Sequence, residues 1–200
     1  MRSVFVLAVG FVAAPGFASL INGDFEAGNT GFTSQYQYVT VSVPPNEGQY
    51  GVTHSSLEWS NFWNTVNNDH TTGSGQFLIV DTVADLTMWS ETVDVAPNTA
   101  YTFGAWLATW TLGFQPAQVA LEIDGQLITT WTGPAPTAWT QYSAAWTSGA
   151  ASTATIRLYS PVHIQPGGDI AIDDITLTAV PAPGALALAV FAPLVGRRRR

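Results

Sequence analysis

Short segments of alternating or β-branched residues recur along this chain between clusters of Gly, Pro, Asn and Asp, and no stretch has the periodicity of a long amphipathic helix. The pattern predicts an all-β domain. The segments predicted as strands are Gln35–Val43, Gln76–Asp81, Thr87–Val95, Ala100–Trp110, Ala117–Ile123, Gln126–Thr132, Thr140–Trp146, Thr153–Tyr159 and Asp169–Thr178. Asp124-Gly125, between two apolar runs, is a strong hairpin signal.

The predicted strands fit a jelly-roll β-sandwich, which folds two Greek keys together. An immunoglobulin-like sandwich is the alternative, but the chain has no cysteine and so lacks the Cys–Trp–Cys spacing of that fold. The longest region without clear periodicity is Asn46–Gly75, which is rich in Asn, His, Ser and Trp. A region of this kind is usually functional, or it contains a short strand or helix.

The charge of the chain narrows the choice of partners. All 14 acidic residues lie between Ser19 and Val180, where Arg157 is the only basic residue, so this body has a formal charge of 1 − 14 = −13. Such a body does not neutralise phosphates, which argues against nucleic acid and anionic membrane surfaces as partners. The acidity favours a divalent cation, and Ca²⁺ is the expected one in an oxygen-rich extracellular setting.

The first 18 residues predict a signal peptide. Met1 and Arg2 give a short positive start, an apolar stretch follows, and Gly16-Phe17-Ala18 supplies the small residues that a signal peptidase requires. The expected cleavage after Ala18 would secrete the rest of the chain. A buried first strand is the alternative, but Pro15 and Gly16 interrupt it.

The last residues, 180–200, combine a proline motif, a short apolar run and four terminal arginines. The run is too short to span a bilayer, which needs roughly 20 apolar residues, and the arginines are expected on the cytoplasmic side. This tail resembles the PEP-CTERM sorting domain of exosortase substrates, with Ala182 in place of the central Glu. The resemblance implies sorting by exosortase-type machinery and transient membrane association through a short hydrophobic helix; a frayed tail or a plain membrane anchor is the alternative. The residues concerned are Pro181, Ala182, Pro183, Arg197, Arg198, Arg199 and Arg200.

The body between these ends, residues 19–179, carries short motifs of a known class. Its start, from Asn22 to Gly28, resembles the Asn-Gly-x-Phe-Glu-x-Gly opening of family 4/9-type carbohydrate-binding modules, which are galactose-binding-like jelly rolls. The segment Ile170–Leu177 resembles their closing strand with its Asp-Asp pair, and Val95–Trp106 and Trp139–Trp146 resemble their middle strands. The resemblance implies a jelly roll and a role in binding extracellular polysaccharide.

The same resemblance implies a structural calcium between the opening and closing strands. Its expected ligands are Glu26 and Asp173, with Asp24 and Asp174 as weaker candidates and Asp69 as a candidate third ligand. Two carboxylates held within a few ångströms of each other repel unless a cation lies between them. The alternative is that Glu26 and Asp173 are solvated acids at strand ends.

Eight tryptophans in one small domain suggest a platform for sugar rings. Alternation along Ala100–Trp110 assigns the odd-numbered apolar residues to the core and places Trp106 and Trp110 on the opposite face. In Thr153–Tyr159 it places Arg157 and Tyr159 on a polar face, where the arginine could hydrogen-bond sugar hydroxyls or a uronate. The alternatives are that the tryptophans belong to the core and that Arg157 pairs with an acid.

The sequence contains no nucleophile elbow or phosphate loop, and its three histidines lack metal-type spacing. We therefore expect a non-catalytic, secreted protein of the cell surface or extracellular matrix that binds glycan through its jelly roll. A structural or adhesive matrix protein with the same fold and no sugar site is the main alternative. A small hydrolase is a third reading, and it would need a cleft with paired carboxylates.

Overall fold

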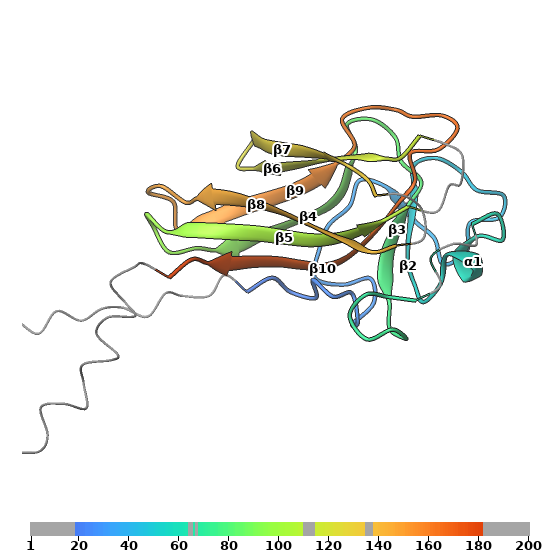
Figure 1. The fold of residues 1–200 in the computed structure, drawn as a ribbon, viewed down its shortest axis with the longest axis horizontal. Coiled ribbons are helices and arrows are strands. Elements are labelled where there is room, and N and C mark those ends of the chain that lie inside the picture. The colour runs from blue at the N-terminus through green and yellow to red at the C-terminus, as the bar shows by residue number, and fades with distance from the viewer. Residues whose placement is uncertain (1–18, 64–65, 67, 110–114, 135–137, 182–200) are drawn as a thin grey trace, which may run out of the picture.

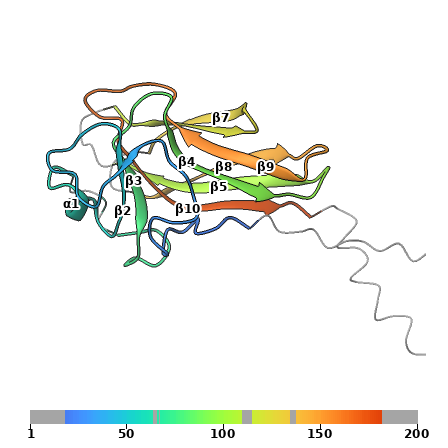
Figure 2. The ribbon, with the colours of Figure 1, turned by 180° about the vertical axis from the view of Figure 1, so that it is seen from behind.

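The computed structural model describes residues 19–63, 66, 68–109, 115–134 and 138–181, and these form two β-sheets packed face to face as a jelly-roll β-sandwich (Figures 1 and 2). One sheet has the strand order β1-β2-β3-β10-β5-β8 and the other β4-β9-β6-β7. The strands are β1 (Gln37–Tyr38), β2 (Gln49–Thr53), β3 (Phe77–Val80), β4 (Thr87–Asp94), β5 (Ala100–Ala108), β6 (Gln118–Ile123), β7 (Gln126–Thr132), β8 (Thr140–Thr147), β9 (Thr153–Tyr159) and β10 (Ile170–Ala179), with one short helix, α1 (Ser56–Trp59). The predicted all-β class is confirmed.

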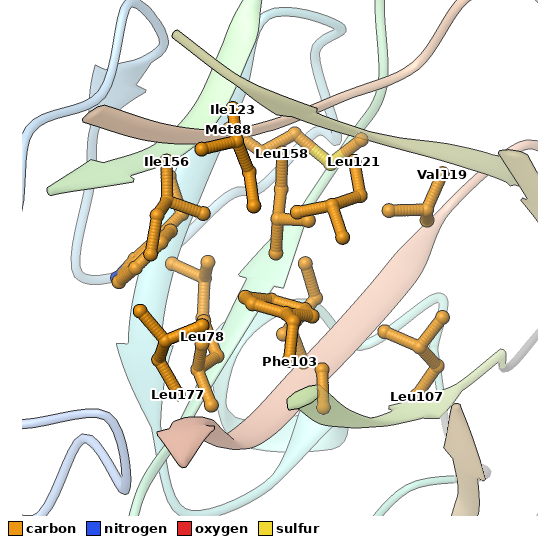
Figure 3. Close-up of a cluster of buried hydrophobic side chains, with 14 of the residues drawn as sticks. Leu78, Met88, Phe103, Leu107, Val119, Leu121, Ile123, Ile156, Leu158 and Leu177 are labelled. Carbon is orange, nitrogen blue, oxygen red and sulfur yellow. The ribbon is translucent and has the colours of Figure 1, made fainter. Parts of the chain in front are cut away.

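The main core fills the space between the two sheets, as Figure 3 shows, where side chains of β4, β6 and β9 face those of β3, β5 and β10. Strand β5 shows how alternation builds this core: Tyr101, Phe103, Ala105 and Leu107 are all buried, as expected from the sequence. Because successive side chains of a strand point to opposite faces, Trp106 lies on the outer face of the six-stranded sheet, where it is half-buried.

The predicted strands after residue 75 are all present, with boundaries within a few residues of those expected. The prediction for Gln35–Val43 is wrong for most of its length, because only Gln37–Tyr38 forms a strand. The region Asn46–Gly75 contains β2 and α1, so it is not one long loop. Ser55 caps α1 through its side chain, which accepts a hydrogen bond from the amide of Leu57.

A second apolar cluster covers part of the outer face of the six-stranded sheet, near α1. Its buried members are Trp59, Trp63, Val66, Phe77, Ile79, Ala108 and Ala171. Trp59 and Trp63 stack with ring centroids 4.7 Å apart, and the indole N–H of Trp59 donates to the carbonyl of Val39. Trp59 of α1 and Trp63 therefore cover this part of the sheet.

The predicted signal peptide, residues 1–18, and the sorting motif from Ala182 to Arg200 lie outside the described residues. Pro181 is described and is exposed. Among the residues with a described structure, no helix is long and apolar enough to cross a membrane.

Candidate functional site

The opening motif folds as a compact loop beside the closing strand. The side-chain amide of Asn22 donates to the carbonyls of Gly28 and Thr30, each at 2.8 Å, and its oxygen accepts from the amide of Ala27. The carbonyl of Gly23 accepts from the amide of Ile175 at 2.8 Å, and a Cβ at Gly23 would overlap the Ile175 carbonyl. The Asn-Gly pair is therefore explained by a close backbone contact between the first segment and β10.

A loop formed by residues 69–76 lies over β10 and is held by carboxylates. Asp173, which is fully buried, accepts hydrogen bonds from the amides of His70 and Thr71, from the Thr71 hydroxyl and from the amide of Asp174. Asp69 accepts from the amides of Thr72 and Gly75, at 2.6 and 2.7 Å. These bonds fix the loop because each replaces a bond to water with one to a rigid partner.

Three of the predicted metal ligands, Glu26, Asp69 and Asp173, hydrogen-bond residues of this loop, and Asp24 does not. Glu26 accepts from the amide of Gln76 at 3.2 Å, next to the Gly75 amide that Asp69 binds. Asp173 binds the other end of the loop, whereas Asp24 accepts from the amide of Glu26 within its own turn, at 3.4 Å. Within the described ranges, no three His, Cys, Asp or Glu side chains form a group with the geometry to hold a metal ion.

Burial and hydrogen bonding shift the pKa values of Asp173 and Asp69 in opposite directions. Burial raises the pKa of Asp173 to about 7, although the amides of His70, Asp174 and Thr71 favour its ionised form. For Asp69 burial also raises the pKa, but the bonds from Thr72 and Gly75 outweigh it, so the net pKa is lowered. Asp69 is therefore ionised in the neutral range, whereas a proton or a cation would relieve the burial of charge on Asp173.

The loop places His70 directly on Trp106. Their ring centroids are 3.6 Å apart with planes 17° from parallel, and Nδ1 of His70 lies 2.5 Å from Oδ2 of Asp174. Trp139 meets the His70 ring edge-on at 6.3 Å and donates from its indole to the carbonyl of Asn68. The result is an aromatic wall on the outer face of the six-stranded sheet, formed by His70, Trp106 and Trp139.

Beyond this wall the outer face is open and rich in hydroxyl groups. We call this surface the open strip; its exposed members are Thr102 of β5, Gln141, Ser143 and Ala145 of β8, and Thr176 and Thr178 of β10. Gly104 pairs with Ser143 on one side and Thr176 on the other, and a Cβ at Gly104 would lie 2.8 Å from the Thr176 hydroxyl. Glycine therefore keeps the strip flat beside Trp106.

Arg157 and Tyr159 lie elsewhere, on the outer face of the four-stranded sheet. The guanidinium donates to the Thr87 hydroxyl at 2.8 Å and to the Asp85 carbonyl at 2.5 Å, and it pairs with Glu122 at 3.4 Å. Its Cζ lies 4.1 Å from the centre of the Tyr159 ring. Arg157 and Tyr159 do not share a groove with Trp106, because β9 and β5 belong to different sheets. Trp110 lies outside the described residues.

Asp69 was a candidate ligand from the sequence, but nothing in the sequence placed His70 on Trp106 or Trp139 beside it. The sequence feature that points to this arrangement is the Asp173-Asp174 pair. The β10–β5 ladder has a bulge between Asp173 and Thr176, with Asp174 at φ 46°, and this bulge turns both carboxylates toward the loop. A sequence gives no direct sign of which distant loop such a bulge will bind.

Comparison with known proteins agrees with the fold. No family model matches the chain, and no curated protein matches it. Among solved structures, the CBM22-1 xylan-binding domain of Paenibacillus barcinonensis Xyn10C has a TM-score of 0.51 at 16% identity, covering 85% of this chain and 99% of that one. TmCBM61, solved with β-1,4-galactotriose, has a TM-score of 0.50 at 14% identity, with coverages of 82% and 99%.

A larger protein also contains this fold. The enzymatically active domain of tailspike protein 4 from bacteriophage CBA120 has a TM-score of 0.51 at 14% identity over 84% of this chain, but the match spans only 22% of the tailspike chain. At such identities the likenesses establish the β-sandwich fold alone.

Proposed function

We propose that this protein is a non-catalytic glycan-binding module that is secreted and displayed at the cell surface or in an extracellular matrix. The observation that carries the proposal is the half-buried indole of Trp106 at the border of the open strip. Indole faces stack on sugar rings, and neighbouring hydroxyl and amide groups bond sugar hydroxyls. Structural likeness to domains named for xylan and β-1,4-galactotriose supports the same role.

A glycan array probed with the purified protein tests this role. Trp106→Ala is expected to weaken binding to the best glycan by about tenfold, since a lost stacking contact is worth about 1.4 kcal/mol. His70→Ala retains the backbone bond from residue 70 to Asp173 and uncovers the indole, so it is expected to keep or increase binding. Trp146→Ala, on the inner face of β8, serves as a matched control. No binding by the wild-type protein to any glycan would contradict the proposal.

One observation favours a structural or adhesive role instead. His70 covers one face of the Trp106 ring, which suits a side chain that only supports the loop. In that case Trp106→Ala and His70→Ala would both lower stability, and the wild-type protein would bind no glycan.

We also propose a structural calcium beside the loop, between Glu26 and Asp69, whose carboxylates accept from the consecutive amides of Gln76 and Gly75. Carboxylate and carbonyl oxygens are the ligands Ca²⁺ prefers. Calcium at 100 times its dissociation constant should stabilise the fold by about 2.7 kcal/mol, or several degrees. The shift should be reversed by chelator and absent in Glu26→Ala. A melting temperature that calcium does not change would contradict this site.

Delivery is the last part of the proposal. The N-terminal leader and the tail that resembles a PEP-CTERM domain support export followed by exosortase-type processing. Expression of the full chain in a host with such machinery should yield a secreted product that lacks both ends. Deleting the four terminal arginines should leave the tail uncleaved, and mass spectrometry of the product distinguishes the two outcomes.

A further inference from the structure

A pocket of about 350 Å³ lies between the first segment and β4, at the edge of the four-stranded sheet. It is lined by residues that include Ile21, Phe32, Thr33, Ser90, Glu91 and Thr92. Thr33 and Ser90 form a β-bridge that ties the first segment to the strand. The pocket belongs to β4 of the four-stranded sheet, so it is separate from the Trp106 face, which belongs to the other sheet.

Glu91 is an unusual residue for this position. Its register partner in β9 is the buried Ile156, so its side chain points inward and is only 8% exposed. One carboxylate oxygen, Oε1, accepts from the amide of Ile21 at 2.8 Å. The other oxygen, Oε2, is buried and has no hydrogen-bond partner among the described residues. A buried acceptor left in this state destabilises the fold, and more so when it carries a charge.

No lysine or arginine side chain among the described residues pairs with this carboxylate. The sequence has no lysine, and five of its six arginines lie at positions 2 and 197–200, outside the described residues. The sixth, Arg157, is engaged by Thr87, Asp85 and Glu122 on the outer face of the same sheet. Burial raises the pKa of Glu91, as expected for a carboxyl without a counter-charge. A cationic ligand would supply the partner that no described arginine provides.

We propose that this pocket binds one amino-sugar unit of a glycan, whose ammonium group pairs with the carboxylate of Glu91. The proposal rests on the proposed function only in taking the ligand to be a glycan. An ammonium satisfies both the charge and the free acceptor, whereas a neutral hydroxyl satisfies the acceptor alone. A uronate would bring a second negative charge next to Glu91 in a body of 14 acids and one arginine, so we expect it not to bind.

The size and the lining of the pocket agree with a single ring. Its volume is near the lower end of the roughly 300–1,000 Å³ range of ligand pockets. The hydroxyls of Thr33 and Ser90 donate to the carbonyls of Ser90 and Ile156, so their oxygens remain available to accept from sugar hydroxyls. Oε2 is covered in the ligand-free form, so binding requires a local rearrangement at the rim of the pocket, where Ile21 is 63% exposed.

Calorimetry with the purified protein tests the proposal on the β-1,4-linked tetramers of glucosamine and N-acetylglucosamine and on the α-1,4-linked tetramer of galacturonate. The glucosamine tetramer is expected to bind at least about tenfold more tightly than its N-acetylated form, and galacturonate not at all. Glu91→Gln should remove this preference while keeping an acceptor for Ile21, and its thermal melt should match or exceed that of the wild type. Asp94→Asn is the matched control, because it removes one exposed charge from the same strand and should leave the preference intact.

Other outcomes overturn the proposal in distinct ways. Equal binding of the two glucosamine forms, or a preference that survives in Glu91→Gln, would show that Glu91 does not select the ligand. Methylamine binding as tightly as the tetramer would overturn the sugar assignment. If Glu91→Gln fails to fold, Thr92→Arg places a competing cation on the exposed rim and should abolish the preference. A Glu91-dependent preference that persists in Trp106→Ala would support this pocket even if the Trp106 face binds no sugar.

Discussion

The two outer faces of the sandwich use their polar and aromatic groups differently. On the four-stranded sheet, Arg157 is surrounded by Glu122, Thr87, the Asp85 carbonyl and the Tyr159 ring, so its donors are used within the fold. On the six-stranded sheet, a loop held by buried carboxylates carries an aromatic wall to the border of a flat strip of exposed hydroxyls. The difference teaches that a residue type suited to binding is informative only when the fold leaves its binding atoms free.

The largest effect on stability is expected when Asp173, on the six-stranded sheet, is replaced. Asp173→Ala leaves the amides of His70, Thr71 and Asp174 without their acceptor and should destabilise the protein by about 3 kcal/mol, or roughly 6–12 °C in melting temperature. Glycan binding by the folded protein should be kept or increased, because the loop no longer holds His70 over the Trp106 ring. Thermal denaturation measures the first effect and calorimetry the second. Asp173→Asn, which keeps one acceptor oxygen, is expected to cost less; equal losses in both variants would contradict the role of the hydrogen bonds.

A smaller effect is expected from the opposite face. Arg157→Met retains the apolar stem and removes the bonds to Thr87, Asp85 and Glu122, so it should destabilise the protein by about 1 kcal/mol. Because those bonds are internal, glycan affinity should not change. Urea denaturation and the same glycan titration test both statements. A tenfold loss of affinity with unchanged stability would move the binding site to the four-stranded sheet.

The smallest expected effect is a pH dependence of stability on the six-stranded sheet, and it comes from Asp81. Burial, assisted by the charge of Glu47, raises the pKa of Asp81 above its ordinary value, although a hydrogen bond with Asp169 lowers it in part. The folded state therefore binds a proton more tightly than the unfolded chain. This stabilisation is complete below the ordinary pKa and is lost as pH rises through the raised one.

Asp81→Asn should remove that dependence. Urea titrations at pH 4 and pH 7 are expected to show a variant whose stability relative to wild type improves toward pH 7. A difference between the two proteins that is the same at both pH values would contradict the burial of an ionised Asp81. Because Asp81 follows β3, the effect concerns the six-stranded sheet.

Much of the fold was predictable because it depends on local patterns. Alternation along β5 and β9 assigned Tyr101, Phe103, Ile156 and Leu158 to the core, and all four are buried. The pattern failed at residues 35–43, where the chain runs beside β2 by only a two-residue parallel pairing. Parallel pairing of so short a segment depends on a distant partner, and no local periodicity encodes it.

The site was predictable only in part, for the same reason. Sequence alternation placed Trp106 correctly on the outer face, yet the stacking of His70 depends on a loop 36 positions away along the chain, held by a β-bulge. The face of Arg157 within its own strand was also correct, but the strand belongs to the other sheet. Alternation assigns a side chain to one of two faces, while the order of strands decides which faces adjoin.

The most direct test of glycan binding at the Trp106 face is a nuclear magnetic resonance titration of isotope-labelled protein with its best neutral glycan. The account predicts shifts at the Trp106 indole N–H and at the amides of Thr102, Ser143 and Thr176, with the signals around Arg157 unchanged. Shifts confined to the four-stranded sheet, or no shifts at saturating glycan, would contradict it.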